Sequence, residues 1–321
     1  MLNRGKYTME AYAHIINTDR SILELNPAIE KFGYRFLCVD ASEFEKNYSE
    51  ILNVPKSSQR PLTIIIGRKQ HGISHELHHA IVHSPVFGQM HFLNLEYPEI
   101  ILLEKIDKFK ITEANDFIVE MEIHTAFYSF VSDLLLQLRL YKAGEIRCSQ
   151  YFQITSGTRQ ISFRKTELSS GSLGNYGVNT EDKKKLSKIL KAKYESNSLT
   201  ELAIKNFNIV YDIPDGRIRF ITLMTCLESL FNLGKDQIAH TIARHLSIIL
   251  SKNKEQFKEN YARIKKLYNM RNSIVHGGEY NGDLVKDYLD LCDKVRKAIN
   301  YCNRPELSKE KLFEDLNMRG F

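Results

Sequence analysis

The sequence has no long hydrophobic run. Its apolar stretches, such as residues 62–66 and 134–136, are far too short to cross a bilayer. The amino-terminal residues also lack the continuous apolar core of a signal peptide. We therefore expect a soluble cytoplasmic protein with no membrane partner.

Cysteine is scarce and unpatterned. The chain has five cysteines, an odd number, and no two of them are spaced as CxxC, which argues against a disulfide framework or a cysteine zinc site. Buried free thiols are the simplest interpretation. The phosphate-binding patterns GxxxxGK[ST] and GxGxxG are absent too, so we expect neither nucleotide hydrolysis nor dinucleotide redox chemistry, and we predict no cofactor.

What the sequence does contain is typical of a globular protein. It is 43% hydrophobic and 26% charged, and its 321 residues favour two domains over one. The formal charge of +6 mildly favours a polyanionic partner. Six lysines lie within residues 183–193, a run that fits either a solvated helix face or a surface that follows RNA.

Hydrophobic periodicity changes along the chain. Strand-like runs at 35–39, 61–66 and 99–103 precede a helical pattern at 114–141 and a strand pair at 145–155 and 157–167. The stretch SSGSLGNYGVN at 169–179 has no hydrophobic period. Beyond it, the pattern predicts helices at about 180–194, 199–211, 217–232, 235–251, 254–276 and 283–301.

These patterns predict an α+β protein of two parts. Residues 1–168 would form a mixed α/β region that acts as a sensor or regulator. Residues 169–179 would be the linker, and residues 180–321 would form an all-helical domain.

One motif suggests a metal. His75, Glu76 and His79 fit HExxH, which on a helix places both imidazoles on one face beside a carboxylate. No glycine and third histidine follow, and a helix here would be short, from about Gly72 to Pro85. The alternatives are a zinc protease, a structural or adventitious metal site, and a plain surface helix, and we favour the plain helix.

The predicted helix at 254–276 carries a polar anomaly. At about 100° per residue, Val275 falls on the core-facing stripe that begins at Phe257 and includes Tyr268. Arg271 and Asn272 fall close to that same stripe, at roughly −40° and +60° from Phe257. A guanidinium among packed side chains is unfavourable without a partner, so this arrangement calls for one.

His276 follows Asn272 by one turn, and Gly277 and Gly278 end the helix directly after it. The helix dipole favours a protonated imidazole there, and histidine suits proton transfer. These side chains could support cleavage of RNA, in which a ribose 2′-hydroxyl attacks the adjacent phosphorus without a metal. The structural alternative is a histidine that caps carbonyls and an arginine paired with Glu228 or Glu279.

Two phrases resemble the Apea-like branch of the HEPN superfamily. RFITLMTCLESLF at 219–231 precedes LYNMRNSIVHGG at 267–278, in the order found in that branch, and the second has the full R-N-x-x-x-H form. The resemblance implies that Arg271 and His276 are catalytic, with Asn272 as their companion. Glu228 and Tyr268 are the candidate supporting residues.

The resemblance also implies a helical bundle that dimerises around one RNA-binding cleft. We expect an endoribonuclease that leaves 2′,3′-cyclic phosphate and 5′-hydroxyl ends, of the toxin or anti-phage type, with a regulatory or antitoxin protein as a further partner. Arg263, Lys265 and Lys266 are candidate contacts for RNA phosphate. The alternative is an inactive HEPN module that binds RNA or protein.

Overall fold

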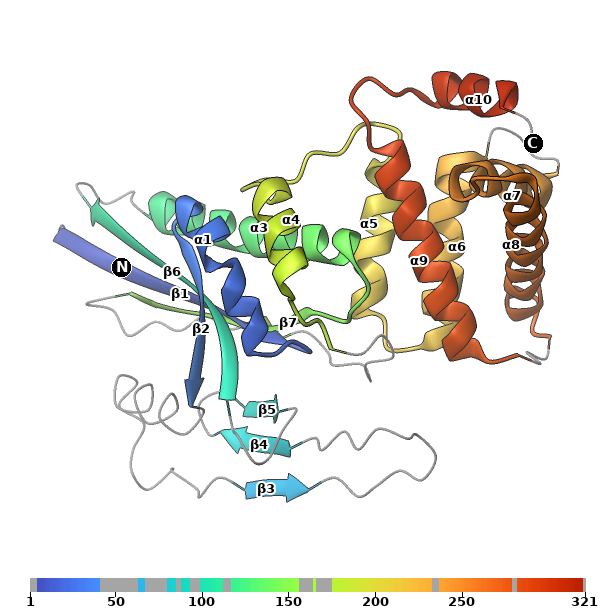
Figure 1. Ribbon diagram of the computed structural model, residues 1–321. Helices are drawn as coiled ribbons and strands as arrows, with labels where there is room; N and C mark the ends of the chain where they lie inside the picture. The colour runs from blue at the N-terminus through green and yellow to red at the C-terminus, as the bar shows by residue number, and fades with distance from the viewer. Residues whose placement is uncertain are drawn as a thin grey trace. The chain divides into compact units, whose positions relative to one another are not determined.

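The structure is a computed structural model that describes residues 5–40, 63–66, 80–84, 88–92, 99–111, 117–155, 164–165, 175–232, 237–278 and 282–319 (Figure 1). The chain forms two compact units. The first comprises Met1–Leu135, Ile146–Thr166 and Asn175–Ala192, and the second comprises Leu136–Glu145, Glu167–Gly174 and Lys193–Phe321. Strands and helices make up the first unit and helices the described part of the second, which confirms the α+β class.

The first unit is built on a five-stranded antiparallel sheet in the order β2-β6-β1-β7-β8. Its strands are β1 (Gly5–Ile16), β2 (Tyr34–Asp40), β6 (Glu99–Ile111), β7 (Arg147–Thr155) and β8 (Arg164–Lys165). The sequence analysis did not predict β1. β1 is the central strand of the sheet, and its side chains are buried on both faces from Ala11 to His14, so the usual alternation of apolar and polar residues is lost.

One long helix, α3 (Phe117–Tyr141), covers a face of this sheet (Figure 1). The ring of Tyr34 on β2 stacks on Phe130 with centroids 3.5 Å apart, and Phe127 lies one helical turn before Phe130, 6.1 Å from the same ring. Aromatic rings one turn apart on a helix fit the pleated surface of a sheet, so these contacts fix how α3 lies across the strands.

Short helical segments complete the first unit. They are η1 (Arg20–Leu25), α1 (Asn26–Ile29), η2 (Glu30–Phe32) and α4 (Thr180–Ile189). The chain before α4 is tied to the end of β1: Tyr176 N donates to Asn17 O at 2.8 Å, and Thr18 Oγ1 donates to Tyr176 O at 2.7 Å. The division between the units therefore differs from the predicted linker at 169–179, since buried Tyr176 anchors 175–192 to the first unit.

A second, three-stranded sheet has the order β3-β4-β5. Its strands are β3 (Thr63–Ile66), β4 (Ala80–Ser84) and β5 (Gly88–Phe92). The sequence analysis favoured a helix up to Pro85, and for residues 80–84 this was wrong. The segment AIVHS pairs with strands on both sides, which fits its β-branched content.

The second unit consists of packed helices. They are α5 (Glu201–Ile209), η4 (Val210–Asp212), α6 (Gly216–Phe231), α7 (Ile238–Leu250), α8 (Lys254–Val275), α9 (Leu284–Cys302) and α10 (Lys309–Met318), together with the end of α3. α6 packs against α5 and α9 (Figure 1). Five of the predicted helices match α5 to α9 closely, whereas α10 was not predicted. No described helix is long and apolar enough to span a membrane.

A buried ion pair lies inside this unit. Arg219 Nη1 of α6 donates to Glu145 Oε1 at 2.8 Å, and both side chains are at most 3% exposed. Arg219 also donates to the carbonyl of Ile213. Both charges are removed from water, so either one would be strongly destabilising if its partner were lost.

We expect Glu145→Ala to destabilise the second unit by about 3–5 kcal/mol, because it leaves the Arg219 guanidinium buried without its counter-charge. Urea unfolding followed by circular dichroism measures the change. Glu201→Ala is the matched control, since it removes an exposed pair with Lys205 and should leave the transition nearly unchanged. Equal effects of the two variants would contradict the role given to the buried pair.

His245 of α7 is buried at the contact with α10. Its Nε2 lies 3.1 Å from Asn317 Oδ1, which also accepts from Arg244, so Nε2 carries the hydrogen. Its Nδ1 is buried and has no hydrogen-bond partner in the described part of the chain. Burial lowers the pKa of His245 below its ordinary value of 6.5.

This lowered pKa predicts a pH dependence of stability. The unfolded chain binds a proton at His245 near pH 6.5, and the folded chain binds it only at lower pH. The free energy of unfolding therefore decreases as the pH falls below about 6.5. His245→Gln removes the group, so the difference in unfolding free energy between wild type and variant should change as the pH falls below about 6.5. Denaturation at several pH values tests this, and a constant difference would contradict it.

Candidate functional site

The carboxyl end of α8 is held by a specific cap. Gly278 N donates to Ser273 O at 2.7 Å and Gly277 N to Ile274 O at 3.3 Å, the two bonds of a Schellman motif. Gly277 has φ of 72°, a left-handed conformation that favours glycine. This cap stops the helix at Val275 and leaves His276 as the capping residue.

Four polar side chains come together near this end of α8. Glu228 Oε1 of α6 lies 3.4 Å from Arg271 Nη2 and accepts a hydrogen bond of 3.1 Å from Tyr268 Oη. Arg271 Nη1 donates to Asn272 Oδ1 at 3.3 Å. The cluster thus contains both predicted supporting residues and two of the three predicted catalytic ones.

The Arg271 guanidinium has partners for only some of its hydrogen-bond donors among the described residues. Its side chain is 25% exposed, and its Nε is buried without a hydrogen-bond partner among the described residues. The 3.4 Å separation from Glu228 is longer than the 2.7–2.9 Å of a tight charge-assisted bond. Burial, and then the Glu228 carboxylate, raises the pKa of Tyr268, so this phenol stays a hydrogen-bond donor at neutral pH.

His276 lies apart from this cluster. Its side chain is exposed, and no hydrogen bond joins its imidazole to Arg271 or Asn272 in the described structure. The expectation that Val275 faces the core was wrong, because its side chain is 46% exposed. The buried residues of α8 are Ile264, Leu267 and Tyr268, and in the last turns Met270 and Ile274 pack partly buried against the core.

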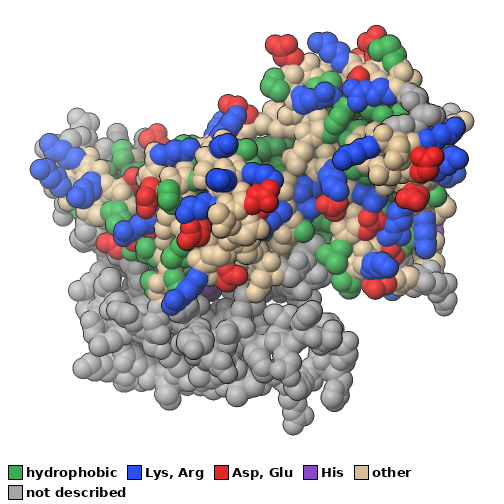
Figure 2. All heavy atoms as spheres, in the orientation of Figure 1, with side chains coloured by type: hydrophobic (Ala, Val, Ile, Leu, Met, Phe, Trp, Pro, Cys, Tyr) green, Lys and Arg blue, Asp and Glu red, His purple; other side chains and the backbone are tan. Residues whose placement is uncertain are grey.

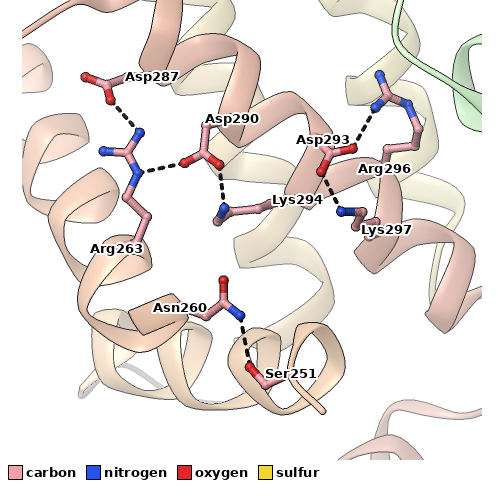
Figure 3. Close-up of polar contacts among 9 residues, drawn as sticks. All are labelled: Ser251, Asn260, Arg263, Asp287, Asp290, Asp293, Lys294, Arg296 and Lys297. Atoms are coloured by element: carbon pink, nitrogen blue, oxygen red, sulfur yellow. Dashed lines mark hydrogen bonds and ion pairs between the residues drawn. The ribbon is translucent and has the colours of Figure 1, made fainter. Parts of the chain in front are cut away.

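The three candidate RNA contacts differ in their surroundings. Lys265 and Lys266 are exposed on α8. Arg263 is engaged by acids of α9: Nη2 pairs with Asp287 at 2.5 Å and Nε with Asp290 at 2.7 Å (Figure 3). These pairs argue against Arg263 as an RNA contact, because its charge is already compensated. The spacing of the two acids, three residues apart on one helix face, was the sequence signal that we missed.

A pocket of about 390 Å³ with a mixed polar and apolar lining lies beside these pairs. Its lining includes Asn260 of α8 and Lys294 and Lys297 of α9. Asp290 pairs with Lys294 at 2.5 Å and Asp293 with Lys297 at 2.7 Å, while Asn260 donates to Ser251 Oγ (Figure 3). Neighbouring carboxylates therefore neutralise Lys294 and Lys297, and these ion pairs argue against the pocket as an anion-binding site.

The metal alternative finds no support in the part of the chain that the structure describes. His75, Glu76 and His79 lie outside the described residues. Within those residues, no group of three or more histidine, cysteine, aspartate or glutamate side chains could hold a metal ion.

Comparison with known proteins gave no match. No protein-family model, no curated protein and no solved structure is similar enough to this chain to assign it to a family.

The cluster predicts a measurable coupling between α6 and α8. Tyr268→Phe should destabilise the fold by about 1 kcal/mol, since it removes a half-buried hydrogen bond. A double-mutant cycle with Glu228→Ala should give a coupling energy of about 0.5–1.5 kcal/mol. Tyr261→Phe on the same helix is the control, because its hydroxyl contacts His240 instead and its effect should add to that of Glu228→Ala. Equal coupling in both cycles would refute the contact.

Proposed function

We propose that this chain is a metal-independent endoribonuclease whose site lies at the carboxyl end of α8. The observation that carries the proposal is the convergence of Glu228, Tyr268, Arg271 and Asn272 at a helix end that also presents His276. An imidazole can transfer protons in phosphodiester cleavage by an internal hydroxyl, and a cationic donor and an amide can stabilise or orient the phosphate.

In the proposed reaction the ribose 2′-oxygen attacks the adjacent phosphorus and the bond from phosphorus to the 5′-oxygen breaks. One proton leaves the 2′-hydroxyl and another reaches the departing 5′-oxygen, so that the products are a 2′,3′-cyclic phosphate and a 5′-hydroxyl. His276 exchanges these protons. Arg271 offsets the charge that grows on the phosphoryl oxygens, and Asn272 orients the phosphate or the imidazole.

The active form is proposed to be a homodimer in which two copies of the helix end share one cleft. On α8, His276 follows Arg271 by five residues, which places their side chains about 140° apart around the helix. The imidazole of one chain thus points away from its own guanidinium. A second copy would supply the missing group and would cover Val275, a large apolar side chain left 46% exposed beside the histidine.

A second candidate function has its own support. The pairing of Arg271 with Glu228 and the separation of His276 also fit a structural clamp between α6 and α8, in a HEPN module that binds RNA or protein without cutting it. In either case the first unit would serve as sensor, regulator or substrate platform. The nuclease acts in toxin-type growth control or phage defence under this proposal, with a regulatory protein as partner.

We expect Arg271→Ala and His276→Ala each to lower RNA cleavage at least about 100-fold, because each removes a group acting on the transition state. Purified protein is incubated with total RNA in EDTA, and the product ends are mapped. The wild type should cut in EDTA and leave cyclic phosphate ends.

Lys258→Ala is the matched control, since it removes an exposed cation from α8 far from the motif and should not change the rate. Cleavage at the wild-type rate by both Arg271→Ala and His276→Ala would reject the assignment. A wild-type protein that binds RNA and leaves it intact would favour the second candidate.

A further inference from the structure

Among the described residues, strands β1 and β6 extend beyond their other neighbours in the sheet. β7 pairs with β1 only from Met9 onward, and β2 pairs with β6 only as far as Lys105. Among the described strands, residues 5–8 and 108–111 therefore pair only with each other. We call this two-stranded extension the terminal ribbon.

The two faces of the terminal ribbon differ in character. Neighbouring side chains on a strand point to opposite faces, and directly paired residues share a face. Lys6 is paired with Lys110, and Thr8 with Lys108, so three lysines share one face. On the other face Tyr7 stacks on Phe109 with ring centroids 5.7 Å apart. The aromatic pair joins the two strands behind the basic face.

The three lysines have no compensating charge among the residues that the structure describes. Lys6, Lys108 and Lys110 are exposed and form no ion pair with any residue that the structure describes. Like charges directly opposite each other on paired strands are unfavourable. Lys105 of the same strand, on the other face, is by contrast paired with Asp107 at 3.0 Å. Lys and Arg side chains gather at the free ends of β1 and β6, at the left of Figure 2.

The first described carboxylate on the basic face lies beyond the three lysines, toward the centre of the sheet. Glu10 follows Thr8 on this face and accepts a hydrogen bond from Tyr12 at 3.0 Å. A polyanion lying along the ribbon would thus meet three cations and a hydroxyl before the first described acid. Attachment to a membrane would need several apolar side chains next to the cations, and the only exposed one among the described residues of this face is Ile106, opposite Glu10.

We propose that the terminal ribbon binds the phosphate backbone of RNA through Lys6, Lys108 and Lys110. The inference rests on the proposed function and adds a substrate-holding surface in the first unit, separate from the residues proposed to cut. Binding of this kind reads the charge of the backbone and not the base sequence. It therefore releases counterions and weakens as salt rises.

The test compares the full-length wild type with Lys6→Gln/Lys108→Gln/Lys110→Gln. The probe is a fluorescent 2′-O-methyl RNA oligonucleotide, which has no free 2′-hydroxyl, so binding is measured whether or not the protein cuts RNA. Fluorescence anisotropy over a series of salt concentrations gives the dissociation constant and its salt dependence. We expect affinity to fall on the order of tenfold or more, and the slope of log K against log salt to shrink by about 2.

The control variant is Lys184→Gln/Lys188→Gln/Lys191→Gln, which removes the same charge from exposed positions on and directly after α4. It should bind the probe nearly as the wild type does. Equal losses in both variants would overturn the proposal, because net charge alone would explain them. Unchanged RNA affinity of the ribbon variant would also overturn it. So would a ribbon variant that no longer binds anionic vesicles but still binds RNA as the wild type does.

Two further measurements keep the outcome clear. Replacing glutamine by arginine at the three ribbon positions should restore both affinity and salt slope, which a misfolded ribbon could not do. If the wild type binds the probe through the ribbon and yet leaves unmodified RNA intact, the nuclease proposal fails and the ribbon proposal stands.

Discussion

The guanidinium of Arg271 occupies a position where α8 otherwise turns apolar side chains toward the core of the second unit, and Glu228 of α6 compensates its charge there. An unpaired charge this close to packed side chains would be costly. The same carboxylate accepts from Tyr268, so one acid restrains two side chains of the neighbouring helix. Together with the apolar core that the two helices share, this contact holds the end of α8, and the motif it carries, against α6.

Much of the second unit could be predicted from the sequence, because its helices carry the usual signals. Asp215, Asn253 and Asp283 each cap a helix by accepting from its first turn, and the apolar residues of α9 recur at helical spacing. The first unit was harder to predict. β1 is buried on both faces over much of its length and so lacks alternation, while α10 is short and its signal is mainly the cap at Ser308.

The site was predicted only in part, for reasons that lie in the packing. A helical wheel gives the direction of each side chain but does not show where along the helix its packing against the core ends. Val275 was therefore placed in the core, although it is the last residue of α8 and is exposed. The wheel also gives no partners on other helices. Arg263 looked like an available cation until the fold brought two carboxylates of α9 to it. Which cations remain uncompensated is decided by tertiary contacts and not by the count of charges.

That distinction bears on how the formal charge of +6 is distributed. The lysine-rich segment around α4 is the most conspicuous basic run in the sequence, yet Lys183 pairs with Glu24 and Lys185 pairs with Glu181. The lysines of the terminal ribbon are few and far apart in sequence, but strand pairing brings them onto one face without acids between them. A polyanion responds to the local excess of charge that remains after such pairing. The strand register of β1 and β6 therefore brings together three lysines that are separated in the sequence, and a count of charges along the chain would not show this.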